Sequence, residues 1–401
     1  MLVDVQAGQS LQPSPEPVRR TAPPLTMPTA SAATESPAVA WQNRGPAVAD
    51  HARRDGPGKA RNGAGKEDIV MMLGPAAGGV YQHPLPAGVA RHSVSKVASN
   101  AGALTAVPAR SVPGVLARAG ALVALTKPRI IELLLVTTVP TMVVAAGGWP
   151  SLWLVVATLA GGTLSAGGAN AANMYLDRDI DALMRRTSRR PLVTGAISAP
   201  AALAFAVGLE AAAFLVLWFA VNPLSAILAL SAALFYVFVY TAVLKRKSPQ
   251  NIVIGGAAGA VPVLVGWAAV QGSLGWAPLV LFALVFLWTP PHFWALAIRY
   301  RDDYANASVP MMPVVVSLEH TARQIFGYAM ATVAASVVFG LVADMHWVYW
   351  TVAVAAGAVF IGLCARLLAV RTSPVAMKVF HWSISYLSLL FVAMAVDVLV
   401  H

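Results

Sequence analysis

Long apolar segments separated by short breaks fill the chain from about residue 125 to its end. At about twenty residues each, such segments are long enough to cross a bilayer as helices. Nine of them can be counted: 130–148, 151–172, 199–220, 224–243, 251–270, 277–298, 325–343, 347–366 and 380–399. This pattern predicts an all-α, polytopic membrane protein with nine transmembrane helices.

Lysine and arginine occur only in alternate breaks of this pattern. The breaks at 146–151, 221–224, 271–276 and 343–347 contain neither residue, whereas the other breaks, together with Lys127 and Arg129 before the first helix, contain sixteen. Cytoplasmic loops carry such an excess of positive charge, so the N-terminus is expected inside and the C-terminus outside. An odd number of helices satisfies this topology. The net charge of +11 is then explained without a nucleic-acid partner.

Residues 1–118 differ from the rest of the chain. They are rich in Pro, Ala, Gly and Ser and lack sustained periodicity, which predicts a disordered tail before a membrane domain at 119–401. Seven acidic residues interrupt the tail, unlike a mitochondrial transit peptide. The plasma membrane of a bacterium is therefore favoured over the mitochondrial inner membrane.

The overall composition agrees with a membrane protein. Hydrophobic residues make up 58% of the chain and charged residues only 11%, with a mean hydropathy of +0.67. Soluble proteins carry about 25% charged residues. The single cysteine, Cys364, excludes a disulfide framework and a cysteine-based zinc site.

Charged residues concentrate after the second predicted helix, in NMYLDRDIDALMRRTSRRP. Asn173, Asp177 and Asp181 are spaced so that they share one face of a helix, whereas Asp179 points away. Oxygen ligands of this kind suit Mg²⁺, which typically shares its coordination with phosphate groups. The alternative is a solvated loop, which remains the better account of the arginines alone. It does not explain why carboxylates align on one face.

A second acidic cluster follows the sixth predicted helix, in the same compartment. Asp302 and Asp303 lie there beside Arg299 and Arg301. Two such clusters around one cavity could hold a diphosphate through metal ions, with an attached apolar chain in the bilayer. The chemistry indicated is metal-assisted departure of diphosphate from an isoprenoid.

Five stretches together resemble the intramembrane UbiA-type prenyltransferases, and in particular the branch that farnesylates heme. The first is the Asn-xxx-Asp-xxx-Asp motif of NMYLDRDIDALMRRTSRRP; the others are LTKPRIIELL, YTAVLKRKSPQNIVIGGAAGAVP, WTPPHFWALAIRYRDDY and VPMMPVV. The likeness covers 120–400. It implies a bundle around a central cavity that opens to the cytoplasmic side, with Mg²⁺ as cofactor and with farnesyl diphosphate and heme B as substrates.

The resemblance also implies roles for individual residues. Asn173, Asp177 and Asp181 would hold the metal, and Asp177, Asp181, Asp303 and Arg299 would form the catalytic set. The substrate-binding set would comprise Lys127, Arg129, Arg190, Lys245, Arg246, Asn251, His292, Asp302 and Tyr304. The second motif departs from the family, because Arg299 stands where an Asp four residues before Asp303 is common. Instead of binding a second metal ion, Asp302 or Asp303 would then orient Arg299 or a base.

Some single residues allow two interpretations. His292 could contact heme, or it could bond to carbonyls freed by the neighbouring Pro-Pro pair. Trp288, Phe293 and Trp294 could shield an allylic cation, but simple packing is the better account.

Three carboxylates lie within predicted helices. Glu132 is expected to pair with Arg129 three residues earlier. Glu210 is expected to face the cavity or a partner, but no partner is visible in the sequence, which favours its neutral form. Asp397 is expected to have a structural role near the outer end of the last helix. The histidines near helix ends, His346 and His401 among them, receive no role.

Three other functions compete with this enzyme. A transporter would use similar carboxylates, but near the middle of the bilayer rather than at one end of the helices. A UbiA-type transferase acting on an aromatic acid differs only in the acceptor. A heme-binding scaffold would need no diphosphate site. A heme A synthase or an oxidase-assembly protein is a candidate partner, besides membrane lipid.

Overall fold

The computed structural model describes residues 114–401, apart from the side chains of residues 129–135. The predicted tail at 1–118 therefore lies almost entirely outside the described residues. The first helix begins at Val115, slightly before the expected domain boundary. The Arg129–Glu132 ion pair also concerns side chains outside the described residues, so it stays a prediction.

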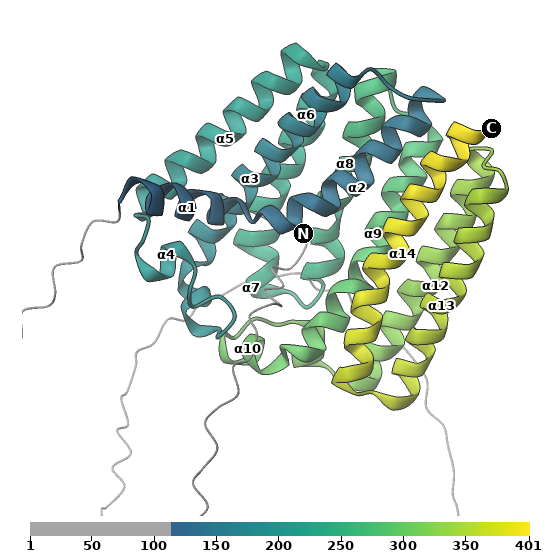
Figure 1. The fold of residues 1–401 in the computed structure, drawn as a ribbon. Coiled ribbons are helices and arrows are strands. Elements are labelled where there is room, and N and C mark those ends of the chain that lie inside the picture. The colour runs from purple at the N-terminus through teal and green to yellow at the C-terminus, as the bar shows by residue number, and fades with distance from the viewer. Residues whose placement is uncertain (1–113) are drawn as a thin grey trace, which may run out of the picture. The chain divides into compact units, whose positions relative to one another are not determined.

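The described residues form helices and no strands, which confirms the all-α prediction (Figure 1). In chain order the helices are α1 (Val115–Thr126), α2 (Pro128–Ala146), α3 (Leu152–Leu183), α4 (Pro191–Thr194), α5 (Ala199–Ala220), α6 (Pro223–Leu234), the π-helix η1 (Phe235–Leu244), α7 (Lys245–Lys247), α8 (Asn251–Gln271), α9 (Trp276–Arg299), α10 (Arg301–Asn306), α11 (Met312–Val315), α12 (Leu318–Val342), α13 (Trp347–Val370) and α14 (Ser373–Val400).

Eight membrane-spanning segments can be recognised among the described residues by length and composition, counting α6, η1 and α7 as one continuous segment. The remaining predicted span coincides with α2, of which only Val136–Ala146 contributes as a shorter apolar helix. The chain is therefore a multi-pass membrane protein, while the count of nine stays a prediction.

Local sequence explains where several helices begin. Side-chain oxygens of Ser151, Asn222 and Ser317 accept hydrogen bonds from backbone N–H groups in the first turns of α3, α6 and α12. These bonds satisfy donors that have no partner within the helix. Proline occupies the first turn of α2, α5, α6 and α14, where its missing N–H costs nothing.

Helix α9 forms the centre of the packing. It contacts α8, α12 and α14, and most of its side chains are buried. Helices α3 and α5 pack closely against each other in a second group. Small residues permit this close approach, because a Cβ atom at Gly161 would collide with Leu217 of α5.

The two ends of the bundle differ in composition. Short elements α4, α7 and α10 lie at the end that carries the arginines and lysines, which we call the basic end (Figure 1). At the breaks without Lys or Arg, the side chains of Trp149, Trp276 and Trp347 are largely exposed. Tryptophan is enriched at membrane interfaces, so these residues are consistent with a membrane boundary at this opposite end.

Candidate active site

The last turns of α3 carry Asn173, Asp177 and Asp181, which we call the carboxylate row. This helix continues to Leu183, well past the end of the apolar segment at 172. Asn173, Asp177 and Asp181 are 3%, 0% and 1% exposed, so the spacing does place the three on one buried face. The Asp179 side chain is 60% exposed and points away from them.

Cationic side chains from three other elements meet this row. Lys127, between α1 and α2, donates from Nζ to Asn173 Oδ1 at 2.9 Å. Lys245 of α7 forms an ion pair with Asp177 Oδ2. Arg190, just before α4, donates from Nη1 to Asp181 Oδ2 at 2.7 Å. Each member of the row therefore has its own basic partner.

The turn after α3 holds Arg190 in place. Thr187 is buried and its hydroxyl donates to the Asp181 carbonyl at 2.9 Å. Backbone bonds from Thr187 and Ser188 to the Met184 carbonyl close the same turn. The arginine-rich stretch is thus partly an ordered loop that returns Arg190 to Asp181, and not only a solvated topology signal.

Asn173 connects the row to the π-helix. Its Nδ2 donates to Asp177 Oδ2 at 2.8 Å and to Thr241 Oγ1 at 3.1 Å. Thr241 in turn donates to the Tyr236 carbonyl, five residues earlier. π-Helical segments often occur at functional sites, and here the segment brings a buried hydroxyl to the row.

Arg246 lies at the edge of the row. Its Nη1 and Nη2 atoms each donate to Asp179 at 2.7 Å, and Nη2 lies 3.9 Å from Asp177 Oδ1. Asp179 therefore holds a guanidinium beside the metal-binding candidates without joining them. This positioning role of Asp179 was not predicted from the sequence.

Lys127 is held in an unusual position. Its backbone has φ 54° and ψ 65°, the left-handed region that residues with a Cβ seldom adopt. Burial, followed by the positive charge of Arg190, lowers the pKa of Lys127 to about 7, and Asp181 and Asp177 oppose this shift only in part. The side chain thus sits where an additional negative charge would stabilise its ammonium form.

The donor set fits a hard divalent cation. The Oδ2 atom of each carboxylate accepts a hydrogen bond from a basic side chain. In contrast, Asp177 Oδ1 and Asp181 Oδ1 are buried and accept no hydrogen bond from the described residues. Buried acceptors without partners are costly. Two carboxylate oxygens in this condition, beside an amide, suit Mg²⁺ completed by water and phosphate oxygens.

A cavity of about 130 Å³ continues the same face of α3 away from the basic end. Asn170, one turn before Asn173, belongs to its lining, as do Ser165 and Tyr236. Small residues contribute much of the wall, among them Gly162, Ala166, Ala229, Ala233 and Gly259. A largely apolar cavity that begins one turn from a charged row suits a ligand with a charged head and an apolar chain.

The second acidic cluster is organised differently. Asp302 and Arg299 are exposed and Asp303 is half-buried, and the structure records no side-chain hydrogen bond or ion pair between either carboxylate and another described residue. Tyr304 is buried. The guanidinium of Arg186 lies 5.6 Å from the Tyr300 ring centre, which brings the loop after α3 against the segment that carries this cluster.

Two further predicted substrate residues are held by protein contacts. Asn251 is fully buried and donates to the Ser248 carbonyl at 2.7 Å. His292 Nδ1 lies 2.8 Å from Ser383 Oγ, and its ring stacks on Trp288 and Phe380. The structure thus gives His292 a hydroxyl partner in place of the proline-freed carbonyls. Arg129 has its side chain outside the described residues.

Glu210 has a partner that is not visible in the sequence. Ser165 of α3 donates from Oγ to Glu210 Oε1 at 3.0 Å. The sequence could not show this, because the two residues lie on different helices.

Asn170 could have been found from the sequence, since it precedes Asn173 by three residues on the same helical face. Thr241 belongs to one of the five stretches that resemble the family, but nothing in the sequence singled it out among its apolar neighbours.

Comparison with known proteins gives consistent matches. The sequence model of the UbiA prenyltransferase family matches residues 134–389. The chain is 56% identical to the protoheme IX farnesyltransferase of Clavibacter michiganensis subsp. michiganensis, over 72% of this chain and 95% of that protein. It is 55% identical to protoheme IX farnesyltransferase 1 of Saccharopolyspora erythraea, over 75% and 96%.

Solved structures share the fold. A structure described as a digeranylgeranylglyceryl phosphate synthase superposes with a TM-score of 0.61 at 16% identity, covering 71% of this chain and 99% of that one. The apo structure of a UbiA homolog from Aeropyrum pernix K1 gives 0.53 at 22% identity, over 67% and 99%.

Proposed function

The chain belongs to the UbiA prenyltransferase family, and we propose that it transfers a farnesyl group from farnesyl diphosphate to a vinyl group of heme B, giving heme O. The observation that carries the diphosphate part is the buried carboxylate row with its basic partners, next to an apolar cavity on the same helix face. The acceptor is inferred from relatives that are named protoheme IX farnesyltransferase.

The charges of the row support a metal–diphosphate complex. Four cationic side chains, Lys127, Arg190, Lys245 and Arg246, face three carboxylates, Asp177, Asp179 and Asp181. With Lys127 in its ammonium form, which a bound anion would favour, this leaves a surplus of one positive charge. A magnesium complex of an isoprenyl diphosphate retains net negative charge, and it would therefore offset the surplus in a region where unpaired charge is costly.

Magnesium would be held by Asp177, Asp181 and Asn173, and when bound it would neutralise charge on the diphosphate oxygens as the leaving group departs. Lys127, Lys245 and Arg190 would donate to phosphate oxygens, because each already extends toward the row. Arg246 would be kept at its edge by Asp179. These donors stabilise the negative charge that develops on the leaving group.

The reaction balances as follows. The allylic C–O bond breaks and diphosphate leaves with the electron pair, so that a farnesyl cation remains in the cavity. The vinyl group of heme B attacks this cation through its terminal carbon, and water adds to the new cation beside the porphyrin ring with loss of a proton. The largely apolar wall of the cavity would limit the access of water that could otherwise trap the first cation.

We also propose that the protein lies in the plasma membrane of a bacterium, with the basic end in the cytoplasm. The alternation of basic breaks supports this orientation, as do the exposed tryptophans at the opposite end. The C-terminus would then lie outside.

One assay tests the proposal. Membranes containing the protein receive heme B, farnesyl diphosphate and Mg²⁺, and the hemes are separated by chromatography. We expect heme O from the wild type, none after chelation of divalent ions, and recovery when Mg²⁺ is restored. Asp177→Asn should lose the product, whereas Asp179→Asn on the same helix, which frees Arg246 but keeps the metal-binding residues, should reduce it far less. Product formed equally by Asp177→Asn would rule out the metal row, and prenylation only of an aromatic acid would rule out heme as acceptor.

A further inference from the structure

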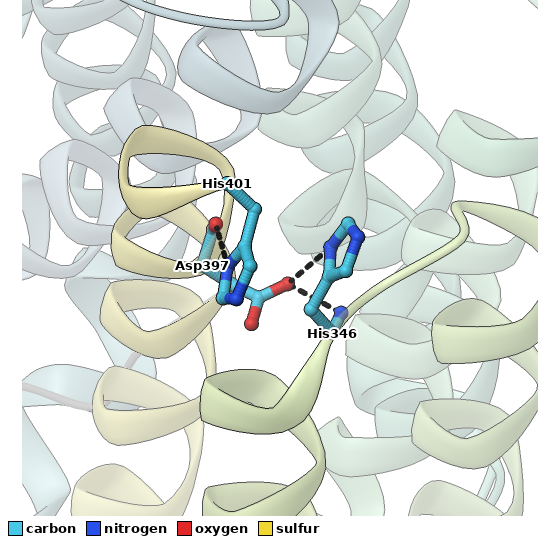
Figure 2. A group of neighbouring side chains, drawn as sticks. All are labelled: His346, Asp397 and His401. Atoms are coloured by element: carbon cyan, nitrogen blue, oxygen red, sulfur yellow. Dashed lines mark hydrogen bonds and ion pairs between the residues drawn. The ribbon is translucent and has the colours of Figure 1, made fainter.

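A separate group of three side chains lies at the opposite end of the bundle, away from the active site. His346 immediately precedes α13, and Asp397 and His401 lie on and just after the last turn of α14 (Figure 2). Each offers one nitrogen or oxygen atom, and these three atoms lie within 4.8 Å of one another. The proposed reaction uses none of them.

Asp397 is the fixed centre of the group. It is completely buried, and its carboxylate accepts hydrogen bonds from the backbone N–H groups of His346 at 2.6 Å and Tyr349 at 3.1 Å. These bonds cap the N-terminus of α13 and set the direction of the carboxylate. They explain the buried carboxylate, but they do not require a histidine on either side of it.

The two histidines have the features of metal ligands. His401 Nδ1 lies 3.0 Å from the Asp397 carbonyl oxygen, to which it can only donate. Its Nε2 therefore keeps a free lone pair, and bonding of the second ring nitrogen to a carbonyl is the usual way in which a metal-binding histidine is oriented. His346 Nδ1 lies 3.5 Å from Asp397 Oδ2. Tetrahedral zinc with ligand distances of about 2.0–2.2 Å separates its ligands by about 3.3–3.6 Å.

A metal ion could reach this group from water, and the His346 ring is free enough to reorient toward it. The His346 side chain is 57% exposed and stands in the connection before α13, so an ion could reach it from water. The two imidazole rings stack, with centres 4.4 Å apart and 3° between their planes. Because an imidazole binds metal in its own plane, the exposed His346 ring would turn out of this stack on coordination.

We propose that His346, Asp397 and His401 bind a divalent transition-metal ion of the zinc type, with water in the fourth position. Two imidazoles and one carboxylate are a common donor set for such ions. The bound ion would join the α12–α13 connection to the end of α14. It would stabilise that end of the helix pair, by an amount that rises with the logarithm of the ion concentration once this exceeds Kd.

The test compares full-length proteins purified in detergent through a tag without histidines. Co²⁺ and then Zn²⁺ are titrated in excess Mg²⁺, which keeps the carboxylate row occupied. We expect the wild type to show the visible absorption of tetrahedral Co²⁺, which Zn²⁺ removes, and a rise in melting temperature with Zn²⁺. His346→Ala and His401→Ala should bind at least about ten-fold more weakly and lose both signals.

A matched control is His320→Ala, because His320 is also exposed but stands at the start of α12, at the basic end. It should bind as the wild type does, and the histidines of residues 1–113 are the same in every variant. Formation of heme O in Mg²⁺ should not change in any of the three variants. Equal Co²⁺ binding by the wild type and His346→Ala, or no tetrahedral Co²⁺ signal from the wild type, would overturn the proposal.

Discussion

The substitution Asp177→Asn changes the charge of the row while keeping its shape. The Asp177 side chain is fully buried and is paired with Lys245, whose own side chain is only 11% exposed. Asparagine has the same size and can still accept the hydrogen bond that Asn173 Nδ2 donates. The substitution therefore removes one negative charge and one metal-binding oxygen, and it leaves the Lys245 ammonium group without a counter-charge.

The expected cost in stability follows from that unpaired charge. Removing one partner of a buried ion pair destabilises a protein by about 3–5 kcal/mol. Lys245 keeps some contact with water, so we expect the lower figure, about 3 kcal/mol. At about 2–4 °C per kcal/mol this corresponds to a melting temperature lower by roughly 6–12 °C. Heme O formation should fall at least about a hundred-fold, because a charge-stabilising group is lost.

A double variant separates the two effects. Asp177→Asn combined with Lys245→Met removes both charges, so most of the lost stability should return. Activity should stay lost, since neither the carboxylate oxygen nor the ammonium group is restored. Thermal unfolding in detergent, followed by tryptophan fluorescence, and heme O chromatography on the same samples measure both. A single variant that melts at the same temperature as the wild type would contradict the buried ion pair, and a double variant that makes heme O would contradict the role of Asp177 in catalysis.

Two other predictions address packing and the cavity. Gly255→Ala should lower stability by about 1–3 kcal/mol, because the added methyl group would collide with the Tyr240 ring; Gly208→Ala, which meets nothing within 4 Å, should cause no loss in the same melting experiment. Ala233→Leu should narrow the cavity and reduce kcat/KM for farnesyl diphosphate more than for geranyl diphosphate. Equal losses with both substrates would contradict placement of the farnesyl chain in this cavity.

The sequence predicted the row but not its surroundings. The spacing of Asn173, Asp177 and Asp181 depends only on helix geometry, which is local. The pairing of each cation with its acceptor depends on the tertiary structure, because Lys127 and Lys245 reach the row from 46 and 68 residues away. Their choice as candidates came from family resemblance, and their pairing came only from the structure.

The apolar pattern of the sequence located the membrane segments, but it did not locate the ends of their helices. Apolar windows ended the second predicted helix at 172 and began the seventh at 325 and the ninth at 380, whereas α3 continues to Leu183, α12 begins at Leu318 and α14 begins at Ser373. A hydropathy window detects the apolar layer alone. A helix that leaves this layer keeps its internal hydrogen bonds, so charged residues extend it without an apolar signal.

The two acidic clusters look alike in sequence but differ in how their charge is balanced, and burial explains the difference. Asp177 and Asp181 are at most 1% exposed, so basic partners must neutralise them even without substrate. Asp302 is exposed to water and needs no such partner. If a metal–diphosphate complex enters the row, the basic side chains can turn from carboxylate to phosphate oxygens while the metal takes their place. The net buried charge then changes little, and the cations that stabilise the empty row are the ones that would hold the substrate.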